Sequence, residues 1–240
     1  MKTKNKPRWG RTGGIRFMIN NHPNTQLLTD YATGGLSMAP LISITTHLQF
    51  CDQCREAVSG LNILGGELLT ECDEAELSED LLAQTLAMLD APMMANAETA
   101  AETPKSSLCP DLASQLPKYL HRFLNSQELE WRSLSSTLSV AAISVGETDY
   151  ELALHRIDAG GKAPVHDHKG TELTVVLKGS FSDEDGIYRE GDFLMREPGD
   201  VHRPSATQDQ ACICLSVLSA PIKLTGIKQV LNPFMRFNPS

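Results

Sequence analysis

The sequence predicts an α+β protein of two domains, in which a small all-α unit of four helices precedes an all-β barrel. Apolar residues recur at helical spacing in the first part of the chain, and short alternating segments separated by Gly, Pro and Asp follow from Trp131 onward. Residues 91–107 are rich in Ala, Thr, Ser and Pro and show no periodicity. We therefore expect a helical domain at 18–90, a linker at 91–110 and a β domain at 111–240.

The first 17 residues form a basic arm that stands outside this pattern. They carry six of the 21 Lys and Arg side chains and no acid, but the apolar stretch of a signal peptide does not follow. The longest apolar runs fall far short of the roughly 20 residues that a membrane span needs. We expect a disordered arm at 1–17, or a translation start at Met18, in a cytoplasmic protein that does not enter a membrane.

The charge balance bears on the class of partner. The formal net charge is −9, and residues 18–240 are more acidic still because the arm holds only basic side chains. Contacts with nucleic-acid phosphates need clustered Lys and Arg, so we expect no direct binding to DNA or RNA. An acidic body suits a partner with a basic surface, such as a nucleic-acid-binding protein held away from its target.

Four helices are expected before the linker. Apolar spacing predicts them at 24–33, 37–49, 52–69 and 78–89. The third has one apolar face, made of Val58, Leu61, Leu64 and Leu68, although Gly65 and Gly66 weaken it. Ser78 is a suitable N-cap for the fourth.

A first metal site is indicated by His47, Cys51 and Cys54, which form the pattern H-x3-C-x2-C. His47 and Cys51 lie on one face of a helix, and Cys54 reaches the same point across a helix start. Such ligands suit Zn²⁺, and His22 is the spare histidine in this half that can complete a tetrahedron. The alternative is a buried cysteine pair with incidental histidines. A thioredoxin-like redox pair is disfavoured because no βαβ pattern surrounds it.

The second half alternates in the manner of strands. The clearest segments are 150–157, 171–181, 191–196 and 211–220, with Gly, Pro and Asp between them. Regular short strands with turn residues between them predict an all-β sandwich or barrel.

A second metal site is indicated by His166 and His168, which project from the same side of a strand because they lie two residues apart. Glu172 has the same parity and follows them if the strand continues past a kink at Gly170. Buried polar groups need partners, and a divalent ion such as Zn, Mn, Fe or Ni would supply one.

These residues belong to a pattern that resembles the two-part signature of cupins. Its first half is Gly160-x5-His166-x-His168-x3-Glu172-x6-Gly179, and its second half runs from Gly191 to His202. The resemblance implies a cupin barrel with His202 as the fourth ligand. Two positions depart from the second half, since Glu197 occupies the usual proline position and Ala206 that of a frequent asparagine.

Cys212 and Cys214 share one face of the last expected strand. We expect small core residues there, and the alternative is a redox pair or thiol sensor near the metal. A disulfide between them is not expected, because strand neighbours at i,i+2 are too far apart to bridge without distortion. The remaining residues of these types, expected to be ordinary core or surface residues, are Cys72, Cys109, His121 and His155.

The order H-x24-H-x3-C-x2-C, opening a small four-helix domain, resembles the zinc-binding anti-sigma domain over residues 18–90. Segments 166–193 and 211–226 resemble the C-terminal cupin of ChrR-type proteins, so the chain is identified as a member of that family. The resemblance implies a helical module that clamps an extracytoplasmic-function sigma factor in a 1:1 complex and blocks its binding to core RNA polymerase. It also implies a scaffolding zinc that joins the first three helices and fixes the angle of the fourth.

The function implied by this resemblance is regulation of transcription, with a cupin that responds to singlet oxygen or related oxidants and releases the sigma factor. The alternative is a metal-dependent cupin oxygenase or isomerase, since a metal with open positions can bind substrate. No residue beyond the ligands suggests a general base or substrate clamp, so we expect no catalytic residue. Passive metal storage explains neither the domain pairing nor the closed first site. We also expect the two functions to be separable at a flexible linker.

Overall fold

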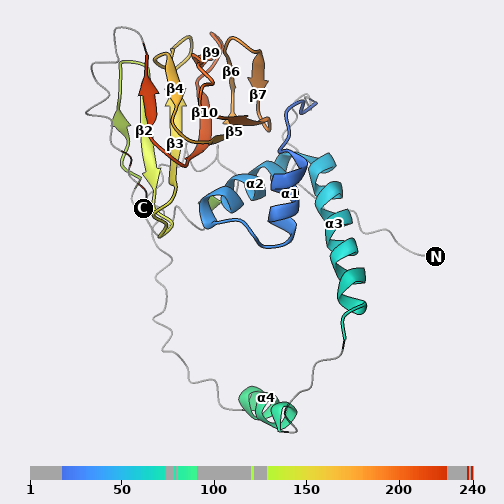
Figure 1. The fold of residues 1–240 in the computed structure, drawn as a ribbon. Helices are drawn as coiled ribbons and strands as arrows, with labels where there is room; N and C mark the ends of the chain where they lie inside the picture. Colours follow the sequence, from blue (N-terminus) through green and yellow to red (C-terminus); the bar gives the residue numbers. More distant parts are fainter. Residues whose placement is uncertain are drawn as a thin grey trace, which may run out of the picture.

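The computed structural model describes residues 18–73, 78, 80–90, 120–121, 129–225, 237 and 239. The predicted arm at 1–17, the predicted linker at 91–110 and Cys109 lie outside these residues. Helices occupy the first part of the described chain and antiparallel strands the second, so the predicted α+β order is confirmed (Figure 1).

The helices are α1 (Thr25–Ala32), α2 (Met38–Phe50), α3 (Asp52–Thr70) and α4 (Leu81–Asp90). They lie close to the predicted ranges, although α4 begins at Leu81, later than the N-cap position predicted for Ser78. Asn24 caps α1, because its side-chain oxygen accepts a hydrogen bond from the amide of Leu27 at 2.8 Å. Among the described helices, none combines the length and the apolar character needed to cross a membrane.

A single extended residue, Cys51, separates α2 from α3. Its φ of −103° and ψ of 108° interrupt the helical hydrogen bonding, so α3 leaves in a new direction. The amide of Cys54 donates to the sulfur of Cys51, which makes Cys51 the N-cap of α3. By contrast, the described side chains of α4 (81–88) are exposed, and Figure 1 shows α4 well apart from α1–α3. That a zinc ion fixes the angle of this helix stays a prediction.

In the part of the β domain that the structure describes, eleven strands form three sheets. The largest has the order β1-β2-β3-β10-β5-β8, and the smaller ones pair β11 with β4 and order β7-β6-β9. Two isolated bridges, His166 with His202 and Lys162 with Ser205, pair the segment that leads into β4 with the segment that leads into β9. The two smaller sheets are joined in this way and close the barrel opposite the large sheet. The strands are β1 (Arg132–Ser133), β2 (Leu138–Ile143), β3 (Glu151–Ile157), β4 (His166–His168), β5 (Glu172–Lys178), β6 (Ser180–Ser182), β7 (Ile187–Arg189), β8 (Phe193–Arg196), β9 (Ser205–Ala206), β10 (Cys212–Leu218) and β11 (Ile222–Leu224).

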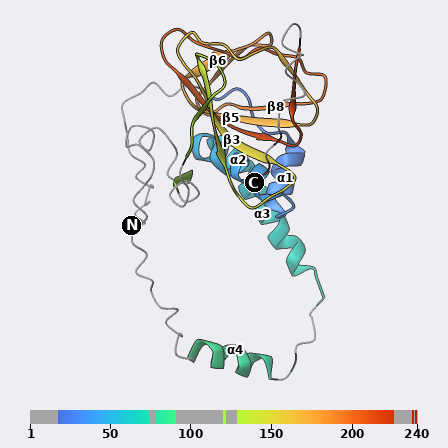
Figure 2. The same ribbon diagram turned by 90° about the vertical axis from the view of Figure 1, so that its left-hand side faces the viewer.

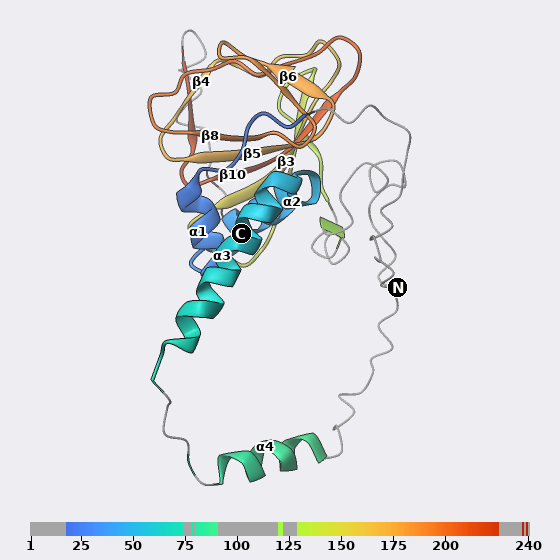
Figure 3. The same cartoon turned by 90° about the vertical axis from the view of Figure 1, so that its right-hand side faces the viewer.

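The centre of the large sheet is buried on both faces. Every residue of β10 is buried: Cys212 and Cys214 face the barrel interior with Phe181 and Leu194, whereas Leu215 and its neighbours on the other face join the core of the helical unit. Figure 3 shows the helices against β5 and β10, on the side away from β4 and β6. The helical unit and the β domain therefore share one continuous core.

Polar contacts reinforce this junction. The carboxylate of Glu147, from the loop between β2 and β3, accepts hydrogen bonds from the amides of Met38 and Ala39, the latter at 3.0 Å. Ser37 makes no side-chain bond at the α2 N-terminus, so Glu147 acts as the cap and its charge also complements the helix dipole. Figure 2 shows the same junction from a second direction, with α2 beneath β5 and β3.

Candidate metal centres

The first group of metal-ligating residues gathers where α2, α3 and the segment before α1 meet. His22 precedes α1, His47 lies in the last turn of α2, Cys51 at the break and Cys54 in the first turn of α3. The structure brings one ligand atom of each within 4.8 Å of the others. His47, Cys51 and Cys54 are buried, and His22 is partly exposed.

The distances within this group fit a tetrahedral ion. Nδ1 of His22 lies 3.4 Å from the sulfurs of Cys51 and Cys54, and Nε2 of His47 lies 3.3 Å from the sulfur of Cys54. Ligands of a tetrahedral zinc are separated by about 3.5 Å when Zn–S and Zn–N bonds have their usual lengths. The four side chains therefore have the chemistry and the spacing to hold a metal ion.

Electrostatics also favours a cation at this point. Burial, followed by the neighbouring Cys51 sulfur, raises the pKa of the Cys54 thiol to about 12. The metal-free pocket thus disfavours the Cys54 thiolate, and a divalent ion would reverse this because it compensates the negative charge. Nδ1 of His47 donates to the carbonyl oxygen of Gly191 at 2.8 Å, which leaves the Nε2 lone pair facing the sulfurs.

Metal-free protein should lose stability as the pH falls from about 6.5 to about 4. Burial lowers the pKa of His47 from 6.5 to about 4, so the unfolded chain binds more protons than the folded one across this window. This residue contributes a slope of at most about 1.4 kcal/mol per pH unit. Urea unfolding above and within the window measures it, and His47→Gln should give a shallower slope. Equal slopes for the two proteins would contradict the assignment.

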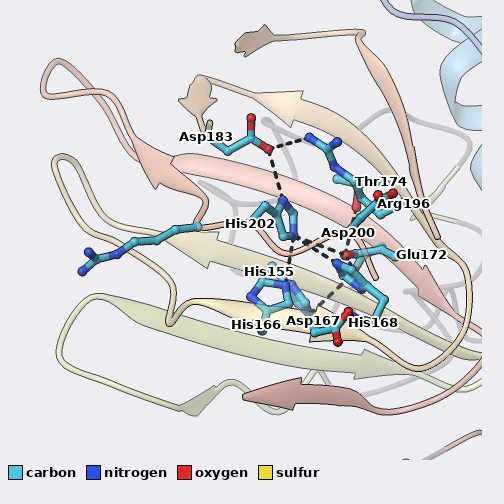
Figure 4. A network of polar contacts seen from close by, with 12 residues as sticks. His155, His166, Asp167, His168, Glu172, Thr174, Asp183, Arg196, Asp200 and His202 are labelled. Carbon is cyan, nitrogen blue, oxygen red and sulfur yellow. Dashed lines mark hydrogen bonds and ion pairs between the residues drawn. The ribbon is translucent and has the colours of Figure 1, made fainter. Parts of the chain in front are cut away.

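The second group lies inside the barrel. His166 and His168 come from β4, Glu172 begins β5, and His202 follows β8 in the loop that bridges to β4. All four are buried, and one ligand atom of each lies within 4.8 Å of the others. Figure 4 shows the three imidazoles converging with the Glu172 carboxylate.

The Nε2 atoms of the three histidines lie close together, as they would around a shared cation. Nε2 of His202 lies 3.0 Å from Nε2 of His166 and 3.2 Å from Nε2 of His168. Nδ1 of His166 donates to the carbonyl oxygen of Pro164 at 2.9 Å, and Nδ1 of His202 faces Oδ2 of Asp183 at 3.1 Å. In neutral rings of this tautomer the lone pairs point at one another, so an ion at the centre satisfies them together.

The carboxylate supports the same conclusion. Oε1 of Glu172 accepts from the hydroxyl of Thr174, but Oε2 is buried and accepts no hydrogen bond from the described residues. Burial opposes its charge, yet His168, His166 and His202 together outweigh that effect and lower the pKa of Glu172. An ionised, unsatisfied oxygen beside three imidazoles is what a divalent ion would bind.

Two partly buried residues, Asp183 and Arg196, hold His202 in place. Oδ2 of Asp183 also accepts from Nη2 of Arg196 at 2.7 Å, and Nη1 of Arg196 donates to Asp185 at 2.6 Å. Although burial acts against its charge, the bonds from His202 and Arg196 lower the pKa of Asp183. Asp183 therefore stays ionised and orients the ring of His202, a role that the cupin pattern did not reveal (Figure 4).

A cavity of about 440 Å³ opens beside this second group. His166, Glu172 and His202 lie on its wall, and most of the remaining lining is apolar, including Leu138, Val140, Ile157, Phe181 and Leu194. His155, which the sequence analysis expected to be an ordinary core or surface residue, also lines this cavity. Burial lowers its pKa, and its Nε2 lies 3.4 Å from the hydroxyl of Ser216. Strand alternation could have predicted the position of His155. Leu152 and Leu154 share one face of β3, so His155 lies on the opposite face.

Both cysteines of β10 are buried in the barrel core, and Cys214 lines the cavity. Their sulfurs are 3.6 Å apart, so the thiols are in contact although they are not bonded. This spacing is shorter than the extended geometry of a regular strand suggests, and β10 is irregular here because its register with β5 shifts between Ile213 and Cys214. Their position fits the expected core role, and Cys72 is exposed.

Comparison with known proteins identifies the family. Residues 121–220 match the family model described as the ChrR cupin-like domain. The chain is 33% identical over 219 residues to the anti-sigma-E factor ChrR of Cereibacter sphaeroides, covering 91% of this chain and 99% of that protein. The crystal structure of Rhodobacter sphaeroides SigE in complex with the anti-sigma ChrR matches with a TM-score of 0.66 and 34% identity, covering 84% of this chain and 99% of that chain. The predicted family is confirmed, and the chain belongs to the ChrR family of anti-sigma factors.

Proposed function

We propose that this protein is a cytoplasmic, zinc-dependent anti-sigma factor. Its helical unit holds an extracytoplasmic-function sigma factor in a 1:1 complex, away from core RNA polymerase. Its cupin binds a divalent metal and releases the sigma factor under oxidative stress of the singlet-oxygen type. Zinc occupies the group His22, His47, Cys51 and Cys54, and a divalent metal, which we take to be Zn, Mn, Fe or Ni, occupies His166, His168, Glu172 and His202.

The observation that carries this proposal is an apolar helix face without a partner in the described chain. Val58 is buried beside the first metal group, but Leu64 and Leu68 continue the same face of α3 and are 55% and 61% exposed. In α4, Leu82 and Leu86 are 71% and 50% exposed. A run of exposed apolar side chains at helical spacing suits another protein surface, and the relative crystallised with SigE makes a sigma factor the natural occupant.

Replacing this face should disrupt the complex. We expect Leu64→Lys combined with Leu68→Lys to weaken sigma binding about a hundredfold, because central apolar anchors dominate interface energies. Ile187→Lys is the matched control: Ile187 is 53% exposed, but it lies on β7 of the cupin. Calorimetric titration with the purified sigma factor measures both. Equal affinities for the two variants would place the sigma interface elsewhere.

The cavity favours a second candidate, a metal-dependent oxygenase or isomerase. Its volume lies in the range of small-molecule sites, and metal ligands on its wall could present an ion to a substrate. Against this candidate, the one further imidazole on the cavity wall that we describe, His155, already contacts Ser216. Retention of anti-sigma activity after the cavity is filled by Leu138→Trp, in protein with full metal content, would argue against a role that needs substrate entry.

A further inference from the structure

The turn between β7 and β8 reaches from the cupin into the first metal group. Gly191 has a φ of +91°, a conformation that favours glycine, and a β-carbon there would lie 2.8 Å from the side chain of Ile19 and 2.9 Å from that of Phe50. This close approach lets the Gly191 carbonyl oxygen accept from Nδ1 of His47. A cupin backbone group thus orients a side chain of the helical group.

The next residue, Asp192, fixes a second member of that group. Its Oδ1 accepts hydrogen bonds from the amides of Asn20 and Asn21 at 2.9 and 3.1 Å, and its Oδ2 accepts from the amide of Arg189 at 2.8 Å. The carbonyl oxygen of Asn21 in turn accepts from the amide of Phe193 at 3.0 Å. Because His22 directly follows Asn21, these bonds set the position of the His22 backbone.

Asp192 is only 1% exposed, so its carboxylate is costly to bury unless these bonds are made. The rings of Phe193 and His47 also form a T-shaped pair, with centroids 5.7 Å apart. At the far end of β8, about 10 Å further on for a strand of this length, Arg196 binds Asp183, which orients His202. One short strand thus contacts His47 at one end and, through Asp183, His202 at the other.

From these contacts we propose that Asp192 is a positioning residue for the helical metal site, and that β8 is the element through which the cupin acts on it. The inference rests on the proposed function, in which the helical site holds zinc and the cupin is the sensor. A displacement of β8 at its Arg196 end moves Gly191 and Asp192, and it withdraws support from His47 and His22 together. The cupin state therefore changes how firmly the helical site holds its metal.

Cobalt provides a probe that sees this site separately. Charge transfer from thiolate to Co²⁺ reports only on Cys51 and Cys54, because the cupin group contains no sulfur ligand. In full-length protein, we expect Asp192→Ala to speed the loss of this absorption to excess chelator about tenfold or more, as residues that orient metal ligands commonly do. Asp192→Asn, which keeps one acceptor oxygen, should be intermediate.

Glu147→Ala is the matched control. Glu147 also joins the cupin to α2, but at the N-terminus of the helix, away from His47. Glu147→Ala should weaken the junction between the cupin and α2, but the rate of cobalt loss should stay within about twofold of that of the parent protein. Equal acceleration by Asp192→Ala and Glu147→Ala, or none by Asp192→Ala, would overturn the inference, and so would a parent protein without the thiolate band. No sigma factor is needed for this measurement, so failure of the anti-sigma proposal would show separately, in the sigma titration.

Discussion

Replacing Cys54 by Ser should remove zinc from the helical unit and abolish sigma binding. The Cys54 sulfur is buried and lies 3.3 Å from His47 and 3.4 Å from His22. Its replacement therefore removes a buried ligand whose place water cannot easily take. Zinc binding contributes about 10 kcal/mol or more to the folding of small zinc domains. Without it, α1, α2 and α3 lose their common anchor, and the exposed apolar face of α3 is no longer held in one orientation.

The measurement combines metal analysis with pull-down of the sigma factor. Cys72→Ser is the matched control, because Cys72 is an exposed cysteine near the end of the same helical unit. It should retain zinc and full binding. His22→Ala should be milder than Cys54→Ser, since His22 is partly exposed and water can take its place. Undiminished sigma affinity in zinc-free Cys54→Ser protein would refute the structural role of zinc.

Alanine at His166, Glu172 or His202 should leave the sigma factor bound but make the protein insensitive to singlet oxygen. A signal can release a partner only if it acts differently on the free and bound forms, and the cupin metal is our candidate for that action. The helical ligands are separate from these residues, so zinc should stay in the first site. Induction of a sigma-dependent reporter should fall from a many-fold rise to almost none.

The reporter is measured with and without photosensitiser and light for each variant. His155→Gln is the control, since His155 lines the same cavity but does not belong to the ligand group. It should still respond. A normal response in His166→Ala would move the sensor elsewhere, and the contacting thiols Cys212 and Cys214 would be the next residues to replace.

Local patterns were sufficient to predict most of the secondary structure. Helical spacing located α1–α3 to within a residue or two, and the alternating segments correspond to β3, β5, β8 and β10. Spacing accounts for only part of each ligand group. His166 and His168 share one side of β4 as predicted, but Cys51 is an extended residue between α2 and α3 and does not share a helix face with His47 as predicted. His202 came from the cupin resemblance, because no local period relates it to the other ligands.

The junction between the two units was not predicted, because no local period encodes which surface a helix packs against. Two signals were present. The segment CICLSVL is apolar at both parities, which is typical of a strand buried on two faces. Gly191 was noted only as part of the cupin pattern, yet its lack of a β-carbon lets Ile19 and Phe50 approach. That sigma binding and signal response are separable stays a prediction. A fragment at 18–90 would lack the contacts that Gly191 makes with His47 and that Asp192 makes with the backbone before His22.

The burial of α2 has a consequence for how such regulators diverge. Ala39, Ile42 and Ile44 are fully buried, and α2 packs against α1 and α3 as well as β5 and β10. A change on α2 would therefore disturb the packing of the helical unit and of the β domain together. Within the described chain, the outer faces of α3 and α4 are exposed and do not pack against the β domain. Under the proposed function, duplicated copies of the gene can thus acquire new partner preferences through α3 and α4 while the cupin stays intact.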